Sequence, residues 1–355
     1  MVVKVGSSIL AGDGGGLDAA AVPQVVAQVA GLHDSGFRAV LVSSGAVAAG
    51  LPALGLDLRP TDIPGLQAAA AVGQGRLMAA YAAAFASQGL IVGQVLLTRD
   101  VLANRDQYLH AREALERMVS MDIVPIVNEN DTVVIDELRV GDNDRLAAIV
   151  SHLTDAGMLV LLTDTPGLLS ADPRFEDAAE LIDAVRHTDR VLDTLGAGRA
   201  GPLGSGGVAT KVAAARMAAW SGIPTAIVPG SEPDAVARAV AGEAVGTWVK
   251  PHRSGLSARK LWIAFGLPSV GRLLIDDGAV RALIDDGRSL LPAGVVGVTG
   301  VFAAGAAVEI YDRAERLVGK GLAALGAGTV RIAAGRHTSE AGGVAVHRDD
   351  LVVFA

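Results

Sequence analysis

The sequence contains no cysteine, and its seven histidines are scattered without metal-binding spacing. Because disulfides, thiolate nucleophiles and cysteine-ligated metal sites all need a thiol sulfur, the missing cysteine excludes each of them. The histidine pattern indicates no metal centre either. Candidate functional residues are therefore sought among the lysines, hydroxyls, amides and carboxylates.

Long apolar runs are also missing. Hydrophobic residues make up 51% of the chain, but many are alanine or valine, and every long stretch contains a charge or a turn former. A membrane-spanning helix needs about 20 consecutive apolar residues, so we expect a soluble protein with no membrane contact. Met1 leads directly into the apolar Val2–Val5 stretch without a secretory signal pattern, which predicts a cytoplasmic location.

Positive charge is scarce as well, with a formal net charge of −8. Residues 1–249 carry 17 Lys/Arg against 28 Asp/Glu, whereas residues 250–355 carry 13 against 10. Domains that bind phosphate backbones are usually more basic than this surplus of three. The composition permits a nucleic-acid contact in the second part of the chain without indicating one.

At 355 residues the chain is long enough for two domains. Apolar runs of strand length alternate with segments of helical spacing over the first 250 residues, which predicts an α/β fold with a mainly parallel sheet sandwiched by helices. The expected strands are 2–5, 39–42, 90–97, 123–127, 158–162 and 225–228, and the expected helices include 22–32, 66–87 and 107–120, with another starting at 46–49.

The periodic pattern breaks at residues 250–255, Lys-Pro-His-Arg-Ser-Gly. We therefore predict a first domain over 1–250, a linker over 251–262 and a small mixed-β domain over 263–355. In the last of these, Asp277-Gly278 and Asp286-Gly287 are expected to form turns between short strands.

A dense polar stretch follows the expected strand at 123–127. Three Asn and four Asp fall within Asn128 to Asp144, and a periodic helix follows, with Asp142 or Asn143 as its expected N-cap. Turns and caps alone could account for any one of these residues. Because ligands bind at the carboxyl ends of strands in open α/β sheets, we favour a polar-ligand site here.

Lys4 interrupts the valines of the first expected strand. Burying its charge costs several kcal/mol unless an anion pairs with it, so the residue indicates an anionic ligand; an edge position with a snorkelling side chain is the alternative. The segment Gly204–Lys211 places glycines at the start of a helix, an arrangement that suits phosphate binding, although it lacks the order of a Walker loop.

Taken together, the motifs resemble the bacterial glutamate 5-kinase family in its two-domain form, over essentially the whole chain. The matching segments, in family order, are Val3-Lys4-Val5-Gly6-Ser7-Ser8, Ser43-Ser44-Gly45-Ala46, Asn128-Glu129-Asn130-Asp131, Gly141-Asp142-Asn143-Asp144, Leu162-Thr163-Asp164 and Gly206-Gly207-Val208-Ala209-Thr210-Lys211. Ser43 and Ser205 stand where the family often has Thr, and Val208 where it often has Met. These departures keep a hydroxyl or similar bulk.

The resemblance implies an amino acid kinase fold followed by a PUA domain, a pseudo-barrel. It implies catalytic roles for Lys4, Lys211 and Asp144, with Asp144 positioning the lysines. It also implies that Ser44, Asp131 and Asn143 hold L-glutamate, and that Lys4, Thr163, Asp164, Ser205, Gly206, Gly207, Val208, Ala209, Thr210 and Lys211 hold ATP. Mg²⁺ would be held mainly by the ATP phosphates, with no dedicated metal ligand in the chain. Feedback inhibition by proline and homo-oligomer formation are further implications.

Phosphoryl transfer to glutamate agrees with the residues present. A γ-carboxylate with a pKa near 4.3 is already an anionic nucleophile at neutral pH and needs no general base. Three alternatives stay open at this point: a kinase of the same fold acting on aspartate, N-acetylglutamate, carbamate or UMP; an RNA-binding protein with a silent kinase domain; and a purely structural role for the lysine–aspartate trio. The asparagine-rich segment and the PUA-like part argue against the first, and the intact phosphate loop and lysines argue against the second.

Overall fold

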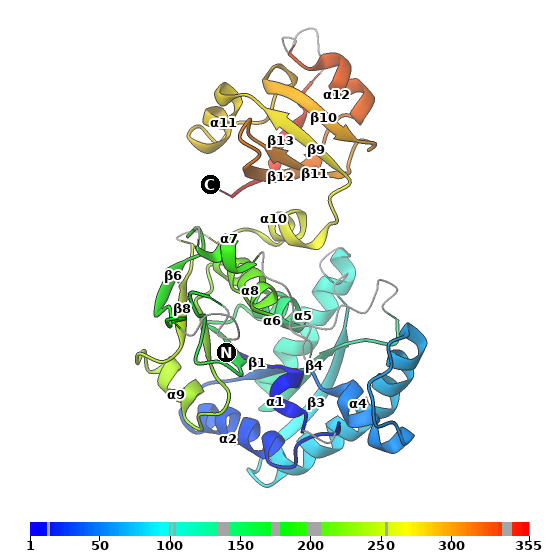
Figure 1. The fold of residues 1–355 in the computed structure, drawn as a ribbon, viewed down its shortest axis with the longest axis vertical. Helices are drawn as coiled ribbons and strands as arrows, with labels where there is room; N and C mark the ends of the chain where they lie inside the picture. Colours follow the sequence, from blue (N-terminus) through cyan, green and yellow to red (C-terminus); the bar gives the residue numbers. More distant parts are fainter. Residues whose placement is uncertain are drawn as a thin grey trace. The chain divides into compact units, whose positions relative to one another are not determined.

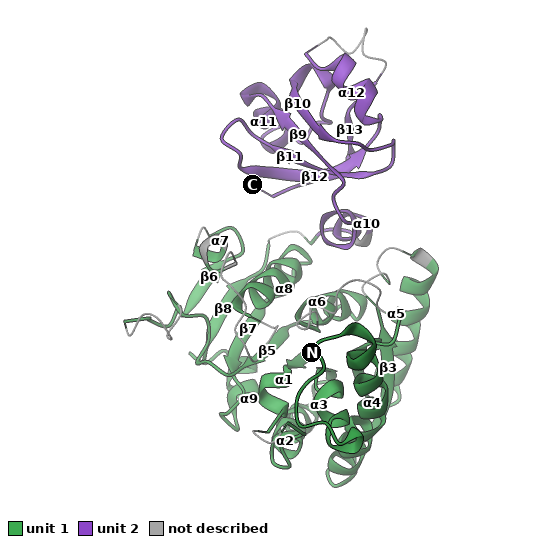
Figure 2. Cartoon of the chain, turned by 45° about the vertical axis from the view of Figure 1, so that its right-hand side comes forward, with its two compact units in different colours: residues 1–255 green, residues 256–355 purple. Residues whose placement is uncertain are grey.

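The computed structural model, drawn in Figure 1, describes residues 1–12, 15–98, 101, 104–133, 143–171, 178–189, 191–196, 207–252, 255–335 and 343–354. The chain divides into two compact units, 1–255 and 256–355, coloured separately in Figure 2. The second unit starts inside the stretch 251–262 that was expected to be a linker, because helix α10 (Ala258–Leu261) belongs to it.

The first unit is built on an eight-stranded sheet in the order β3-β4-β2-β1-β5-β7-β8-β6. Its pairs are parallel except β7 with β8. The strands are β1 (Val2–Val5), β2 (Val40–Ser43), β3 (Ile91–Leu97), β4 (Ile123–Glu129), β5 (Leu159–Thr163), β6 (Ala184–Arg186), β7 (Thr225–Pro229) and β8 (Thr247–Lys250). β1, β2 and β5 are buried along their whole length, which explains why their residues are apolar apart from Lys4 and the last residues of β2 and β5. The predicted mainly parallel sheet is confirmed.

Helices cover both faces of this sheet (Figure 1). Val3 and Val5 face a core shared with α2 and α4, whereas Lys4 points the opposite way, toward α6 and α8. The helices are α1 (Ser7–Leu10), α2 (Ala21–Asp34), α3 (Ala46–Gly50), the 3-10 turn η1 (Pro52–Leu54), α4 (Ile63–Ala86), α5 (Arg105–Ser120), α6 (Asn143–Leu153), α7 (Val191–Gly196), α8 (Val208–Trp220) and α9 (Ala235–Val240). Within the described ranges, no helix has the length and apolar character that crossing a membrane requires.

Glycines allow α3 and α4 to cross at very short range. A Cβ added to Gly73 would lie 1.8 Å from the Ala46 carbonyl oxygen, and one added to Gly50 would lie 2.0 Å from that of Ala69. Neither site could hold a side chain without moving a backbone. The crossing fixes α4 beside the turn that joins β2 to α3, where the polar site described below begins.

The second unit holds a five-stranded mixed sheet in the order β10-β9-β11-β12-β13. β9 and β11 are parallel and the other neighbours antiparallel, which confirms the expected mixed-β character. These strands are β9 (Gly271–Ile275), β10 (Val295–Gly300), β11 (Ala307–Tyr311), β12 (Leu317–Ala323) and β13 (Val346–Val353). The helices that follow α10 are the π-helix η3 (Trp262–Gly266), α11 (Asp277–Ile284), the 3-10 turn η4 (Pro292–Gly294) and α12 (Ala327–Ala333).

Two local expectations for this unit are wrong. Asp277-Gly278, predicted as a turn, starts α11, because the Asp276 side chain accepts a hydrogen bond of 2.7 Å from the Ala279 N–H and caps the helix. Ile263, expected to open the strand region, lies in the π-helix η3. The Asp-rich cap resembled turn chemistry, since Asp serves both purposes.

The α3–α4 crossing yields a stability prediction. Gly73→Ala should lower the free energy of unfolding by about 2 kcal/mol or more, because the new methyl group overlaps the Ala46 carbonyl. Gly75→Ala in the same helix is the matched control. Its Cβ meets nothing within 4 Å, so it should stabilise by roughly 0.5–1 kcal/mol. Chemical denaturation followed by circular dichroism measures both, and equal stabilities would show that the crossing is looser than described.

Candidate active site

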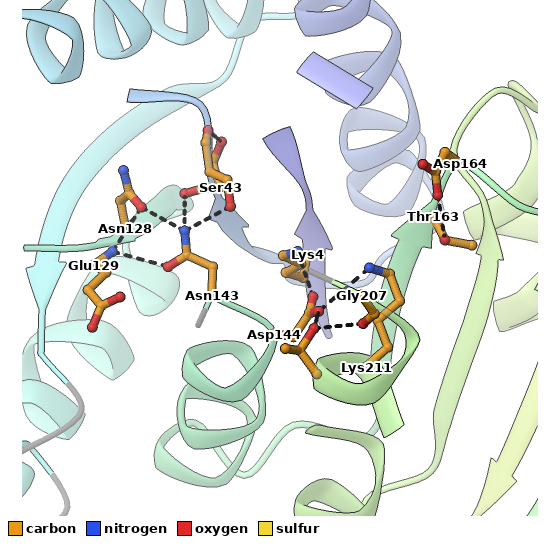
Figure 3. A network of polar contacts seen from close by, with 12 residues as sticks. Lys4, Ser43, Asn128, Glu129, Asn143, Asp144, Thr163, Asp164, Gly207 and Lys211 are labelled. Atoms are coloured by element: carbon orange, nitrogen blue, oxygen red, sulfur yellow. Dashed lines mark hydrogen bonds and ion pairs between the residues drawn. The ribbon is translucent and has the colours of Figure 1, made fainter. Parts of the chain in front are cut away.

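Three charged side chains, those of Lys4, Asp144 and Lys211, meet beside β1 in the middle of the sheet (Figure 3). Lys4 comes from β1, Asp144 from the first turn of α6 and Lys211 from the first turn of α8. Lys4 Nζ lies 2.5 Å from Asp144 Oδ1, and Lys211 Nζ lies 3.6 Å from Asp144 Oδ2. The side chains of Lys4 and Asp144 are only 2% and 0% exposed. The structure thus brings together all three predicted catalytic residues.

The ionisation of this group is set by burial and by its members. Burial lowers the pKa of Lys4, and the neighbouring Asp144 carboxylate opposes that shift. Burial also works against the charge on Asp144, but Lys4 and Lys211, with hydrogen bonds from Lys4 and Thr210, hold the pKa of Asp144 below its usual value. Within this group the two lysines outnumber the one carboxylate, an arrangement that suits an anionic ligand.

The start of α8 adds further groups on the Lys211 side. Gly207 is the N-cap of α8, and Thr210 Oγ1 donates a hydrogen bond of 2.6 Å to Asp144 Oδ2. The amide groups at the start of a helix and its dipole favour a phosphate there. Of the residues expected to hold ATP, Ser205 and Gly206 lie outside the described residues, whereas Gly207, Val208, Ala209, Thr210 and Lys211 form this helix start.

Asn143 organises a second polar group on the other side of Lys4. Its Nδ2 donates to Ser44 Oγ and to Asn128 Oδ1, both at 2.9 Å, and lies 3.2 Å from the Ser43 carbonyl oxygen. Its Oδ1 accepts from the Glu129 N–H at 3.3 Å. Asn143 is the first residue of α6 and so is not its N-cap, and Asp142, the other expected N-cap, lies outside the described residues. The side chain instead joins the carboxyl ends of β2 and β4.

Two residues of α4 support this group from behind, and sequence reasoning missed both. Tyr81 OH lies 2.8 Å from Ser43 Oγ, and Gln74 Oε1 accepts a hydrogen bond of 2.8 Å from Asn128 Nδ2. Tyr81 shares a buried stripe of α4 with Leu77 and Phe85. The signal in the sequence is two polar groups seven residues apart on an otherwise apolar face, a spacing that places both on one side of a helix.

Asp131, the third residue expected to hold glutamate, lies just beyond the end of β4. Burial raises the pKa of Asp131 to about 6, and the positive charge of Arg59 opposes the shift. Among the described residues, the hydrogen bonds do not join Asp131 to Ser44 or Asn143. Asp131 therefore lies near the site because it follows the end of β4, and Arg59 is the charged residue that acts on its carboxylate.

Thr163 and Asp164 mark the carboxyl end of β5, opposite the Asn143 group in Figure 3. Thr163 Oγ1 lies 3.3 Å from Asp164 Oδ1, and the Thr163 carbonyl accepts from the Gly230 N–H at 2.7 Å. Since β1 lies between β2 and β5, the groups expected to hold glutamate and ATP flank Lys4 on opposite sides. This is the arrangement expected at a switch point of an open α/β sheet.

Comparison with known proteins gives consistent results. A model of the amino acid kinase family matches residues 1–229, and a PUA domain model matches residues 271–343. The chain is 43% identical to a glutamate 5-kinase of Pelobacter propionicus over 362 aligned residues, covering 100% of this chain and 97% of that protein.

Two further relatives agree with the first. Glutamate 5-kinases of Chromohalobacter salexigens and Pseudomonas paraeruginosa are each 48% identical to this chain and cover 99% of it, with 95% and 97% of their own lengths aligned. The likeness therefore extends through both compact units. On these matches, the chain belongs to the amino acid kinase family and has the two-part organisation of glutamate 5-kinases.

Proposed function

We propose that this chain is a glutamate 5-kinase, a transferase that moves the γ-phosphoryl group of ATP to the side-chain carboxylate of L-glutamate. The product is L-glutamyl 5-phosphate, the first intermediate of proline biosynthesis. Full-length similarity to proteins of that name supports the assignment. The structural observation that carries it is the buried Asp144 held between Lys4 and Lys211, with a helix N-terminus on one side and an amide cluster on the other.

Charge compensation is the main task of such a site. Two unit charges about 4 Å apart repel by about 4 kcal/mol at an effective dielectric of 20, so a carboxylate and a triphosphate do not approach unaided. Phosphoryl transfer is accelerated mostly by positioning and by cations aimed at the phosphoryl oxygens. Lys4 and Lys211 would supply those cations. Asp144 would keep both lysines protonated and hold their ammonium groups toward the phosphoryl oxygens.

Ser44 has a defined role in this proposal. Because Asn143 Nδ2 donates to Ser44 Oγ, the serine hydroxyl keeps its own proton for another acceptor. A carboxylate oxygen of glutamate is such an acceptor. Asn143 would orient Ser44, and Asp131 would bind the α-ammonium group by charge.

ATP would lie on the β5 and α8 side, against Thr163, Asp164, the residues from Ser205 to Thr210, and both lysines. ATP-dependent kinases use Mg²⁺, which would be held mainly by the phosphates and neutralise part of their charge. The exposed Asp164 offers the oxygen ligand that Mg²⁺ prefers, so the residues at this end of β5 fit the ion. Proline inhibition, homo-oligomer formation, an RNA contact of the second unit and a cytoplasmic location remain predictions of the family likeness.

Trapping the acyl phosphate with hydroxylamine tests the substrate. Incubation with Mg-ATP and hydroxylamine should yield a hydroxamate with glutamate and far less with aspartate or N-acetylglutamate. A clear preference for either of the latter would overturn the assignment. ATP turnover that does not respond to glutamate would instead favour a silent kinase domain.

The two lysines should act on the chemical step. Lys4→Ala and Lys211→Ala should each lower kcat by about 100-fold or more while changing the KM for glutamate much less, because the lost interactions strengthen in the transition state. Lys250→Ala removes an exposed lysine at the end of β8 and is the control. Near-normal kcat in a folded Lys4 or Lys211 variant would make that lysine structural.

The raised pKa of Asp131 predicts a pH dependence. Above pH 6 the carboxylate is ionised and can bind the α-ammonium group, whereas below pH 6 it is protonated and this attraction is lost. Between pH 7 and 5 the kcat/KM for glutamate should therefore fall as pH decreases, with an inflection at about 6 in the free enzyme. Asp131→Asn should raise the KM and remove the inflection. An unchanged profile in Asp131→Asn would assign the inflection to another group.

The compact units predict where the chain can be cut. We propose a kinase domain over 1–250, a linker over 251–262 that includes α10 at the start of the second unit, and a PUA domain over 263–355. The site residues all belong to the unit 1–255, so a protein ending at Gly255 should fold and keep a kcat within about threefold of the full chain. Loss of kcat in a folded truncated protein would show that the second unit helps to build the active site.

A further inference from the structure

Helix α4 carries two polar side chains that face the back of the Asn143 group. Gln74 and Tyr81 are seven residues apart, which is close to two full helical turns, so both lie on the same side of α4. Leu77 and Phe85 on this side are fully buried in the core of the first unit. A hydroxyl and an amide among such neighbours are costly unless they are hydrogen-bonded.

The direction of the Tyr81 hydrogen bond follows from counting protons. Ser43 Oγ donates to the Ser44 carbonyl oxygen at 2.9 Å, which uses the one proton that a serine hydroxyl has. The 2.8 Å contact between Ser43 Oγ and Tyr81 OH must then have Tyr81 as the donor. Burial raises the pKa of Tyr81, which keeps this proton in place. Tyr81 therefore fixes the Ser43 hydroxyl and, through it, the backbone at Ser44.

Gln74 fixes a second direction. Its Oε1 accepts from Asn128 Nδ2 at 2.8 Å, so Asn128 turns its Oδ1 toward Asn143 Nδ2, which donates to it at 2.9 Å. If the Asn128 amide were reversed, its NH₂ group would face the NH₂ group of Asn143, and two donors would oppose each other. Within the described part of the chain, Gln74 Nε2 is buried without a hydrogen-bond partner. The same orientation of the Gln74 amide that leaves Nε2 without a partner directs Oε1 toward Asn128.

We propose that Gln74 and Tyr81 are positioning residues for the glutamate pocket. They set the donor and acceptor directions of Asn128 and Ser43, and these two residues in turn hold Asn143 and Ser44 so that the Ser44 hydroxyl proton points to the substrate carboxylate. The inference rests on the proposed function and adds two residues from a helix that no sequence motif had connected with the site.

Conservative substitutions test the proposal because they remove a polar atom and keep the bulk. Tyr81→Phe and Gln74→Met should each raise the KM for glutamate by about three- to tenfold, the usual effect of one hydrogen bond. The KM for ATP should stay within about twofold, since Gln74 and Tyr81 hydrogen-bond to Asn128 and Ser43, on the proposed glutamate side of Lys4. A general loss of stability would instead lower the active fraction and leave both KM values unchanged.

Matched controls lie outside the site. Tyr108→Phe removes a hydroxyl from α5, where Tyr108 packs against His152, and Gln24→Met alters an exposed glutamine of α2. Both should leave the KM for glutamate unchanged. If wild-type protein forms no glutamyl hydroxamate, the proposed function fails. If it does, and neither Tyr81→Phe nor Gln74→Met raises the glutamate KM above its control, the positioning proposal fails while the function stands.

A double-mutant cycle shows whether Gln74 acts through Asn143. Gln74→Met added to Asn143→Ala should raise the KM for glutamate by less than about 1.5-fold, because the residue that it orients is already gone. Multiplication of the two single effects would overturn the relay and make Gln74 independent of Asn143. The cycle also decides the matter if Tyr81→Phe fails to fold, since it involves α4 through Gln74 alone.

Discussion

The site depends on one shared carboxylate. Asp144 is fully buried and contacts Lys4 from the central strand and Lys211 from α8, so it ties three separate segments of the chain to one point. Breaking a buried ion pair by removing one partner is strongly destabilising, because the remaining charge has no water to solvate it. The same constraint that holds these segments together also keeps two cations aimed at one place, which is what phosphoryl transfer requires.

Strand order turns this contact into a site with two sides. β1 has β2 and β4 on one side and β5 and β7 on the other. Loops leaving these strands diverge, so amides and hydroxyls gather beyond β2 and β4, and a glycine-led helix start lies beyond β5. The proposed nucleophile and the proposed phosphoryl donor would thus approach Lys4 from opposite directions, as an in-line transfer needs.

Much of this arrangement could be predicted from the sequence, because local signals and the global fold agree. The valines around Lys4 predicted a buried strand, which is β1. The polar residues after Val127 predicted a strand end, and the glycines before Lys211 predicted a helix start, which are the end of β4 and the start of α8. Where local chemistry is ambiguous, prediction failed: Asp276 and Asp277 resemble a turn, but in the structure the Asp276 side chain caps the start of α11.

Contacts between distant segments could not be predicted from one sequence. The bond of Asn143 to Ser44 spans 99 residues and that of Gln74 to Asn128 spans 54, and no local pattern shows which residues pair. Tyr81 looks like an ordinary core aromatic until Ser43 is placed beside its hydroxyl. Polar atoms at regular positions on an apolar helix face are the one sequence signal that such supporting residues leave.

The central claim is that Asp144 acts by holding two lysines for the transfer step. Single-turnover phosphoryl transfer by Asp144→Asn, with ATP and glutamate both saturating, tests this most directly. The substitution keeps the shape of the side chain and removes its charge. The account therefore predicts that the rate falls by about 100-fold or more in a folded protein that still binds ATP. A rate close to that of the unchanged protein would contradict the account and make the lysine–aspartate group a structural ion network.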